Sequence, residues 1–333
     1  MPVEGSVRAM VLEQVGRPLR LVERPDPPAS PGHVVVKVGA CGVCRTDLHV
    51  CDGDLSQPKL PLVPGHEIVG TVIATGEGVP RRLIGRKGGV PWLGHTCGHC
   101  PYCREGRENL CDAPGFTGYS IDGGFATHAV VEAGYAFELP DDTDPVATAP
   151  LLCAGLIGWR SLKMAGEGRT IGIYGFGAAA HILVQVCKHR GQSVYAFVRP
   201  GDEAGRKFAL DLGAVWAGFS GERPPVPLDA AIIFAPAGEL VPMALDVVRK
   251  GGTVVCGGIH MSDIPSMPYR LLWGERRVVS VANLTRGDGA EFFSIAKAAE
   301  VRCVTIVYAL EHANEALDDL RAGRINGAAI IVP

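Results

Sequence analysis

The pattern of hydrophobic and polar positions changes near residue 153 of the 333-residue chain. Before that point, β-branched runs at 34–38 and 68–74 are separated by stretches rich in glycine and proline, a pattern typical of strands. After it, short apolar runs alternate with segments of helical periodicity. The sequence therefore predicts a strand-rich region from about residue 7 to 150, followed by a region of a different class.

The second region predicts an alternation of strands and helices. Buried strands are predicted at 170–174, 194–198, 230–234, 253–256 and 278–281. Helices are predicted at 178–190 and 240–250. Strands that alternate with helices indicate a parallel sheet with helices on both faces, so the fold class is α/β in this part of the chain.

The last stretch, about 287–333, contains two helical pieces and an apolar run at 328–332. We expect this run to be a closing strand that rejoins the first domain. The predicted organisation is therefore one domain of residues 1–152 and 287–333, and a second of residues 153–286. The length is sufficient for each domain to bury its own core.

Composition narrows the class of protein. The chain is 47% hydrophobic and 20% charged, and 32 basic against 35 acidic side chains give a net charge of −3. No run of Lys or Arg indicates a nucleic-acid or membrane surface, and no segment reaches the ~18 apolar residues of a membrane span. With no signal-like N-terminus, we expect a cytoplasmic protein. Eleven cysteines in that compartment favour metal binding or catalysis over disulfides.

Four of these cysteines fall within fifteen residues, in the pattern Cys97-x2-Cys100-x2-Cys103-x7-Cys111. Four thiolates on a turn-rich loop form a closed tetrahedral zinc site, which would fold the segment 94–114. The alternatives are an iron–sulfur cluster and unliganded or disulfide-paired cysteines. The compact bacterial cluster motif ends with a three-residue gap and a proline, whereas here the gap is seven and Asp112 follows. We predict a structural zinc.

A second candidate site combines residues far apart in the chain. His66 and Glu67 open an apolar run that predicts a half-buried strand, and polar side chains entering an apolar interior need a partner. Cys44 and Cys153 offer two sulfurs, and two sulfurs with one imidazole leave a fourth zinc position for water or substrate. A cysteine that only fills apolar space and a structural histidine are the alternatives for each residue alone.

A glycine-rich turn begins the second region. Gly175 and Gly177 follow a predicted strand and open a predicted helix, with Ala180 where a third glycine is usual, which predicts a dinucleotide-binding turn. An acidic residue about twenty positions later would bind the ribose 2′-hydroxyl of NAD. The chain has Arg199 there, which favours the 2′-phosphate of NADP, although a solvated arginine is the alternative.

With these motifs in this order, the chain resembles the zinc-dependent alcohol dehydrogenases of the medium-chain dehydrogenase/reductase superfamily, most of all the bacterial ones. The motifs are Cys-Arg-Thr-Asp at 44–47, Gly-His-Glu at 65–67, the four-cysteine segment and the Gly-x-Gly turn. The resemblance implies a GroES-like catalytic domain, interrupted by a Rossmann domain. It also implies two zinc ions per chain and NAD(P) as cofactor.

The resemblance assigns roles around the catalytic zinc. Cys44, His66 and Cys153 are implied as its ligands, and Glu67 as an occasional inner ligand. Asp47 is implied to orient His66. Cys41 lies three residues before Cys44, and we prefer Cys44 because the Arg-Thr-Asp motif follows it directly.

It also assigns roles around the substrate and the cofactor. Thr46 matches the hydroxyl that takes the alcohol proton, and His49 matches the imidazole that passes it to solvent. Arg45 matches a pyrophosphate contact, and Trp92 and Leu93 match pocket positions. A departure stands at position 157, where Ile replaces the Thr of many relatives.

The predicted activity is therefore hydride transfer between a primary or simple secondary alcohol and NAD(P), giving an aldehyde or ketone. One alternative is an aldehyde reductase of the cinnamyl alcohol dehydrogenase type. Another is a catalytically silent sensor that binds zinc and dinucleotide. We expect a small-molecule substrate, no nucleic-acid or membrane partner, and a homodimer or homotetramer.

Overall fold

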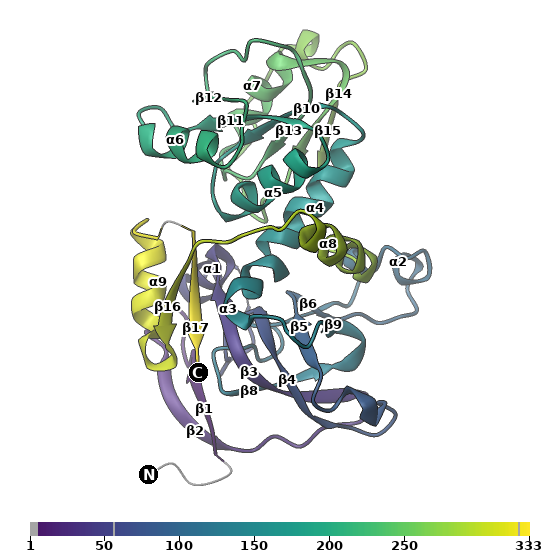
Figure 1. The fold of residues 1–333 in the computed structure, drawn as a ribbon, viewed down its shortest axis with the longest axis vertical. Helices are drawn as coiled ribbons and strands as arrows, with labels where there is room; N and C mark the ends of the chain where they lie inside the picture. Colours follow the sequence, from purple (N-terminus) through teal and green to yellow (C-terminus); the bar gives the residue numbers. More distant parts are fainter. Residues whose placement is uncertain (1–5, 56, 326) are drawn as a thin grey trace. The chain divides into compact units, whose positions relative to one another are not determined.

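The computed structural model describes residues 6–55, 57–325 and 327–333, and the chain forms two compact units (Figure 1). Unit 1 comprises Met1–Cys153 and Cys303–Pro333, and unit 2 comprises Ala154–Arg302. The sequence placed the second boundary at 286/287, whereas the structure places it at 302/303. The difference is one helix, α8 (Arg286–Ala298), which packs against a helix of unit 2.

Unit 1 is built on a seven-stranded sheet in the order β16-β17-β3-β4-β5-β9, with β8 paired to β3. Its strands are β3 (His33–Val43), β4 (Glu67–Thr75), β5 (Lys87–Val90), β8 (His128–Glu132), β9 (Phe137–Leu139), β16 (Thr305–Ala309) and β17 (Ala328–Val332). Two small sheets accompany it: β1 (Ser6–Val11) with β2 (Arg20–Pro25), and β6 (Leu93–His95) with β7 (Gly115–Phe116). The expected closing strand is confirmed, because β17 pairs antiparallel with β3.

The helices of unit 1 are short. They are α1 (Arg45–Asp52), α2 (Pro101–Arg104), α3 (Pro145–Thr148) and α9 (Ala313–Arg321). Single 3-10 turns are η1 (Arg81–Leu83), η2 (Glu108–Leu110), η3 (Ala133–Tyr135), η4 (Ala149–Leu152) and η6 (Leu310–His312). The core lies against the central strands β3 and β4, where Val36, Ile68 and Ile331 are fully buried with Leu12 and Phe125.

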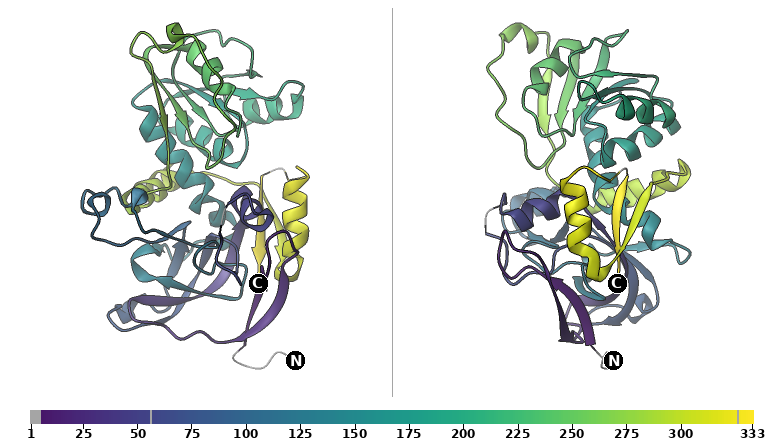
Figure 2. Two further views of the ribbon diagram at one scale, coloured as in Figure 1. Left: turned by 180° about the vertical axis from the view of Figure 1, so that it is seen from behind. Right: turned by 90° about the vertical axis from the view of Figure 1, so that its left-hand side faces the viewer.

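Unit 2 contains a six-stranded sheet in the order β12-β11-β10-β13-β14-β15, and all its pairings are parallel. The strands are β10 (Thr170–Tyr174), β11 (Ser193–Val198), β12 (Trp216–Phe219), β13 (Leu228–Ile233), β14 (Val248–Cys256) and β15 (Arg277–Ser280). The helices are α4 (Ala154–Ala165), α5 (Ala178–His189), α6 (Glu203–Asp211) and α7 (Leu240–Val247), besides α8 and the turn η5 (Tyr269–Leu271) (Figure 2). The predicted fold class is confirmed.

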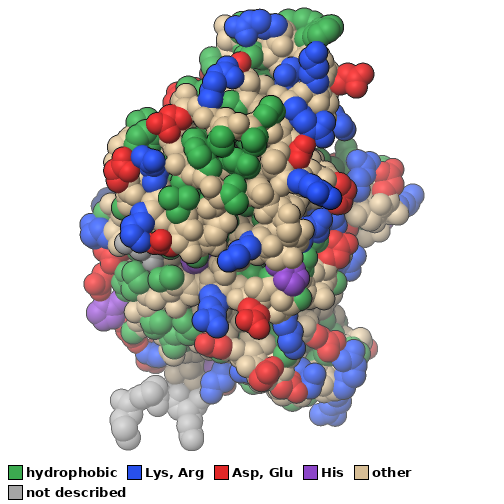
Figure 3. All heavy atoms as spheres, turned by 45° about the horizontal axis from the view of Figure 1, so that its top comes forward, with side chains coloured by type: hydrophobic (Ala, Val, Ile, Leu, Met, Phe, Trp, Pro, Cys, Tyr) green, Lys and Arg blue, Asp and Glu red, His purple; other side chains and the backbone are tan. Residues whose placement is uncertain are grey.

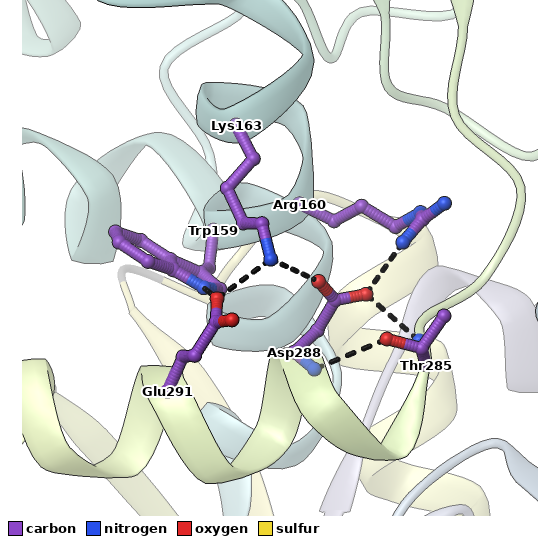
Figure 4. A network of polar contacts seen from close by, with 6 residues as sticks. All are labelled: Trp159, Arg160, Lys163, Thr285, Asp288 and Glu291. Carbon is purple, nitrogen blue, oxygen red and sulfur yellow. Dashed lines mark hydrogen bonds and ion pairs between the residues drawn. The ribbon is translucent and has the colours of Figure 1, made fainter. Parts of the chain in front are cut away.

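A polar cluster joins α8 to α4 inside unit 2 (Figure 4). Asp288, 1% exposed, lies 2.6 Å from Nη1 of Arg160 and 3.1 Å from Nζ of Lys163. The backbone N–H of Thr285 also donates to Asp288, at 2.8 Å, and the Thr285 hydroxyl accepts from the Asp288 N–H, which caps α8. Glu291, one turn later, accepts from Lys163 at 2.6 Å. The buried carboxylate is therefore fully paired by protein groups.

The surface carries both signs of charge. Figure 3 shows Lys and Arg side chains interspersed with Asp and Glu on the face that it presents. Among the residues that the structure describes, no helix has the length and apolar character needed to cross a membrane.

Candidate functional site

Three separate elements of unit 1 bring the second candidate set together. Cys44 caps α1 directly after β3 ends, Glu67 is the first residue of β4, and Cys153 follows the turn η4. The ligand atoms of Cys44, His66, Glu67 and Cys153 all lie within 4.8 Å of one another. The two sulfurs are 3.7 Å apart.

Asp47 fixes the orientation of the His66 ring within this set of residues. It is fully buried, and its Oδ1 lies 3.1 Å from Nδ1 of His66. The same carboxylate accepts backbone N–H groups from Gly65 at 3.2 Å and from Cys44 at 2.8 Å. A carboxylate accepts hydrogen bonds, so Nδ1 of His66 carries a proton and Nε2 faces the cluster. Against the effect of burial, Asp47 and Cys44 raise the pKa of His66, and a metal ion bound at Nε2 would take the place of a proton there.

The Nε2 atom of His66 tests whether a metal fits here. Both residue and atom are buried, and among the described residues Nε2 has no hydrogen-bond partner. A buried polar atom without a partner carries a desolvation cost that a metal ion would remove. Two thiols and a carboxyl group within 4.8 Å complete a donor set that suits zinc. The residues present therefore fit a metal ion.

The pKa values of the acidic groups in the cluster are shifted in opposite directions. The hydrogen bond from Cys153 holds the pKa of Cys44 well below its ordinary value, and His66 lowers it further. The pKa of Cys153 is raised by its hydrogen bond with Cys44 and by burial. Burial raises the pKa of Glu67, and the neighbouring Cys44 thiolate adds to the shift. Such crowding of negative charge is what a divalent cation relieves.

Glycine 42 makes room for Glu67. A Cβ at that position would lie 1.8 Å from Oε2 and 2.8 Å from Cδ of Glu67, so any larger residue would force the carboxylate to move. Cys41, its neighbour, is fully buried but faces Gly65 and Gly124 and is not among the clustered ligand atoms. The geometry therefore brings Cys44, and not Cys41, into the group.

The four-cysteine segment forms a second group. The sulfurs of Cys97, Cys100, Cys103 and Cys111 lie within 4.8 Å of one another, and all eleven cysteines are free thiols. Backbone N–H groups of Cys97 and Ala113 donate to Cys111 at 3.3 and 3.4 Å. A backbone hydrogen bond from Asp112, with others, lowers the pKa of Cys100 to about 6. These backbone donors favour the thiolate of Cys100, the form that binds zinc, whereas burial raises the pKa of Cys111 to about 11.

An aromatic group lies beside His66. Trp92 meets the imidazole edge-on with ring centroids 5.0 Å apart, and Leu93 is fully buried next to it in β6. Phe116 and Tyr119 stack on Trp92 at centroid distances of 5.2 and 5.8 Å. Sequence reasoning found Trp92 but missed Phe116 and Tyr119. The signal available was the run Gly-Phe-Thr-Gly-Tyr directly after the four-cysteine segment.

Helix α1 carries the other predicted residues of unit 1. The Thr46 hydroxyl is 3.7 Å from Sγ of Cys44, and Thr46 is 9% exposed. His49 lies one turn later on the same helix, and its Nδ1 is 2.7 Å from Oδ2 of Asp54. Asp54 was not among the residues predicted from the sequence. Arg45, the first residue of the helix, is exposed.

The predicted cofactor residues lie in unit 2. Gly175 has φ +86° directly after β10, and a Cβ there would meet the backbone nitrogen of Ala235 at 2.8 Å. Gly177 caps the twelve-residue helix α5, has open space around it, and Ala180 is fully buried behind it. Arg199 is exposed at the end of β11. This is a strand-turn-helix of the kind that binds a pyrophosphate at the helix N-terminus.

The last residue noted in the sequence is Ile157, which stands where many relatives have Thr. Ile157 lies in the first turn of α4 and is half-buried, between the buried Leu156 and Gly158.

Comparison with known proteins identifies relatives over the whole chain. Residues 30–141 match the alcohol dehydrogenase GroES-like domain family. The chain is 46% identical over 323 residues to a probable alcohol dehydrogenase, AdhA, of Mycobacterium tuberculosis, covering 95% of this chain and 93% of that one. It is 37% identical to an alcohol dehydrogenase of Geobacillus stearothermophilus, with 98% of each chain covered.

Solved structures agree in fold. An acetophenone reductase of Geotrichum candidum in complex with NAD superposes with a TM-score of 0.88 at 26% identity, covering 100% of this chain and 99% of that chain. A cobalt- and zinc-bound thermostable alcohol dehydrogenase of Pyrobaculum aerophilum gives 0.88, also at 26% identity, covering 98% and 100%. These proteins share the two-unit architecture with this chain.

Proposed function

The chain belongs to the zinc-type alcohol dehydrogenases of the medium-chain dehydrogenase/reductase superfamily, and we propose that it interconverts primary or simple secondary alcohols with aldehydes or ketones. NAD(P) is the hydride carrier. The observation that supports a working site is the buried, unpartnered Nε2 of His66, which converges with Cys44, Glu67 and Cys153. A sensor with a retired site would not need to keep this donor set.

We infer that Cys44, His66 and Cys153 hold the catalytic zinc. A zinc ion bound there would polarise the alcohol oxygen and lower its pKa. Glu67, whose carboxylate lies within 4.8 Å of the other ligand atoms, would serve as an occasional ligand of the same ion. Asp47 holds the His66 ring and its tautomer, as carboxylates commonly do beneath metal-bound histidines.

Two side chains of α1 carry the alcohol proton to solvent in this proposal. Thr46 lies beside Cys44, so its hydroxyl is placed to accept the proton from an alcohol bound at the cluster. His49, three residues later, is on a neighbouring part of the same helix surface and passes the proton to solvent. A bound nicotinamide would supply the acceptor for the hydride of the carbinol carbon.

The glycine turn of unit 2 holds the dinucleotide in this proposal. Gly175 and Gly177 let the backbone approach the pyrophosphate, and Ala180 packs the helix against the sheet. By the family resemblance, Arg45 is proposed as a further pyrophosphate contact. Arg199 binds the adenosine ribose and its 2′-phosphate in this proposal. It is exposed directly after β11, and no ion pair with another described residue occupies its guanidinium group. The nearby carboxylate of Asp202 is already bound to the N–H of Gly205 at 2.8 Å.

Replacing Arg199 tests this cofactor preference. In Arg199→Asp, we expect the ratio of kcat/KM for NADP over NAD to fall by about 10-fold or more, because the 2′-phosphate loses a charge-assisted partner and meets a carboxylate. Arg169→Asp, an exchange at an arginine that precedes β10, is the matched control. An unchanged ratio in Arg199→Asp would mean that Arg199 only faces solvent.

The four cysteines at 97–111 hold a second, structural zinc in this proposal. Among the residues that the structure describes, the set holds four sulfurs and no further donor, so it leaves no position open for substrate. In this proposal the chain therefore binds two zinc ions, one catalytic and one structural.

The aromatic group beside His66 favours a second candidate substrate class. Trp92, Phe116 and Tyr119 form a stacked apolar wall next to the proposed zinc. Aromatic rings stack favourably on such a wall, which suits benzyl or cinnamyl alcohols and the matching aldehydes. A kcat/KM for cinnamyl alcohol that exceeds that for ethanol by about 100-fold would support this class. Equal values would favour short aliphatic alcohols.

We propose a homo-oligomer assembled through unit 2. Strand β15 is an edge of the six-stranded sheet, and an unpaired edge strand is a template for pairing with another chain. Large apolar side chains are exposed between β14 and β15, at Ile259, Ile264, Tyr269 and Trp273. Light scattering should give a dimer or tetramer, and Trp273→Glu should shift it toward monomer. An unchanged mass would place the interface elsewhere.

The activity itself is tested by oxidation of benzyl alcohol with NAD and with NADP, before and after zinc chelation. Turnover that chelation removes and added zinc restores supports the dehydrogenase. If no alcohol or carbonyl compound turns over while the protein still binds dinucleotide and zinc, the sensor is the better description.

A further inference from the structure

The loop that follows α1 folds back onto His49. The backbone carbonyl of His49 accepts N–H groups from Gly53 at 3.1 Å and from Leu55 at 3.2 Å. Between these two residues, Oδ2 of Asp54 lies 2.7 Å from Nδ1 of His49. Three consecutive loop residues are therefore tied to one histidine.

The two neighbours of Asp54 are themselves anchored. Gly53 has φ +90°, and a Cβ there would lie 2.6 Å from the Val15 side chain, so the turn requires glycine. Leu55 packs against the hydrophobic core of unit 1. The Asp54 carboxylate is thus aimed at His49 by the backbone on both sides of it, although its own side chain is 59% exposed.

We propose that Asp54 is a positioning residue of the proton relay, which keeps His49 in the tautomer that carries its proton on Nδ1. This inference rests on the proposed function. A carboxylate that accepts from Nδ1–H makes Nε2 the basic nitrogen of the ring. Helix α1 already uses this device once, because Asp47 holds Nδ1 of His66 and leaves Nε2 for the metal.

The relay step is balanced as follows. Nε2 of the neutral His49 ring accepts the proton that has left the alcohol. The hydrogen bond from Nδ1–H of His49 to Asp54 stays intact. The resulting imidazolium is paired with the Asp54 carboxylate. Loss of the Nε2 proton to solvent water then restores the starting tautomer. In this scheme Asp54 exchanges no proton with substrate or solvent and acts only through His49.

A merely structural surface pair offers the matched control within the same unit. Nδ1 of His312 lies 2.8 Å from Oε2 of Glu315 on α9, and both side chains are about as exposed as Asp54, at 61% and 60%. Glu315→Ala removes an imidazole–carboxylate pair of the same geometry outside the proposed site. Its effect measures what losing such a pair costs on its own.

The experiment compares wild type, Asp54→Ala, Asp54→Glu and Glu315→Ala as zinc-loaded full chains. The first readout is the tautomer of His49 from the nitrogen-15 shifts of its ring, with the signal identified by its absence in His49→Gln. We expect the Nδ1–H form in wild type, a gain of the Nε2–H form in Asp54→Ala, and no change in Glu315→Ala.

The second readout is steady-state alcohol oxidation. In Asp54→Ala, kcat should fall on the order of 10-fold with KM nearly unchanged, and imidazole added as a proton acceptor should restore part of it. Asp54→Glu should recover most of the rate, and Glu315→Ala should retain the wild-type rate. The thermal unfolding midpoint of each variant shows whether it is folded.

Two outcomes overturn the inference. The first is an Asp54→Ala enzyme that keeps both the wild-type tautomer and the wild-type kcat. The second is a loss of rate with the tautomer unchanged and no recovery with imidazole, which would mean that Asp54 only stabilises the loop. Failure of the wild-type protein to oxidise any alcohol would instead contradict the proposed function, and the nitrogen shifts would still report on the pair.

Discussion

The two candidate metal sites of unit 1 are built in opposite ways. The cysteines at 97–111 come from one short segment, and three of their sulfurs are satisfied by backbone N–H groups of that segment. The other set joins Cys44, His66 and Cys153 from three elements spread over more than a hundred positions, and it encloses a buried histidine nitrogen without a partner. The first arrangement suits a metal that folds a loop, and the second suits a metal that does chemistry on a preformed fold.

The sharpest way to break this comparison is to remove a ligand from the dispersed set. His66→Ala or Cys44→Ala should lower kcat/KM for alcohol oxidation by about three orders of magnitude or more, because the alcohol oxygen loses its electrophile. The fold should persist, since the sheet β3-β4 does not depend on this ion. Circular dichroism and steady-state rates measure both quantities. Cys187→Ala, at a buried cysteine of α5, is the control and should retain most of the activity.

A smaller change acts on the group that orients the dispersed set. Asp47→Asn should weaken zinc binding at this site by about 10- to 100-fold, because an amide no longer enforces the Nδ1–H tautomer of His66. Competition with a chromogenic chelator measures the affinity. Asp141→Asn, which changes an exposed partner of Arg86, serves as control. Equal zinc affinity in Asp47→Asn and wild type would show that Asp47 does not act through His66.

The compact set should respond in stability more than in rate. Cys100→Ala should lower the thermal unfolding midpoint by about 5 °C or more, because the segment loses the ion that orders it. The remaining folded fraction should oxidise alcohol at nearly the wild-type rate per catalytic site. If the unfolding midpoint and the zinc content stay unchanged, the structural-zinc proposal is wrong.

The polar cluster of unit 2 offers a contrast to both metal sites, because protein groups alone pair its buried carboxylate, Asp288. Hydrogen bonds from Thr285 and from Arg160 and Lys163 lower the pKa of Asp288 in the folded chain, against the effect of burial. Its contribution is therefore present above the unfolded pKa of about 4 and is lost as the pH falls through the folded value.

Asp288→Asn should reduce the free energy of unfolding at pH 7 by about 2 kcal/mol, with zinc content unchanged. Its unfolding midpoint should also fall less steeply than that of wild type between pH 5 and pH 3. Asp211→Asn, at the exposed pair with Lys207, should change stability little. Parallel pH profiles in wild type and Asp288→Asn would contradict the assigned role.

Local sequence patterns predicted most of the fold. Strands 170–174 and 328–332 were predicted with the bounds that the structure shows, because buried β-branched runs between turn residues have few other solutions. The predicted helix at 240–250 was too long: α7 ends at Val247 and β14 begins at once. Helix α8 was assigned to the wrong side of the boundary, since its pairing with Arg160 and Lys163 depends on tertiary contacts.

The site shows the same division. The spacing of Cys97 to Cys111 was readable as a site without any knowledge of the fold. The group of Cys44, His66 and Cys153 was proposed from its residue types, and the family resemblance then assigned its roles. Its spacing in the sequence carried no signal, because that spacing is set by how β3, β4 and η4 meet. Asp54 was not found at all. An aspartate after a glycine is ordinary in a loop, and only the turn back onto His49 distinguishes this one.

The most direct test of the account is the number of zinc ions bound by the purified protein and two variants, measured by elemental analysis. We predict two ions per chain in wild type, one in His66→Ala with alcohol oxidation lost, and one in Cys100→Ala with oxidation retained per catalytic site. Two ions in His66→Ala together with wild-type turnover would contradict the central claim that this buried histidine holds the catalytic metal.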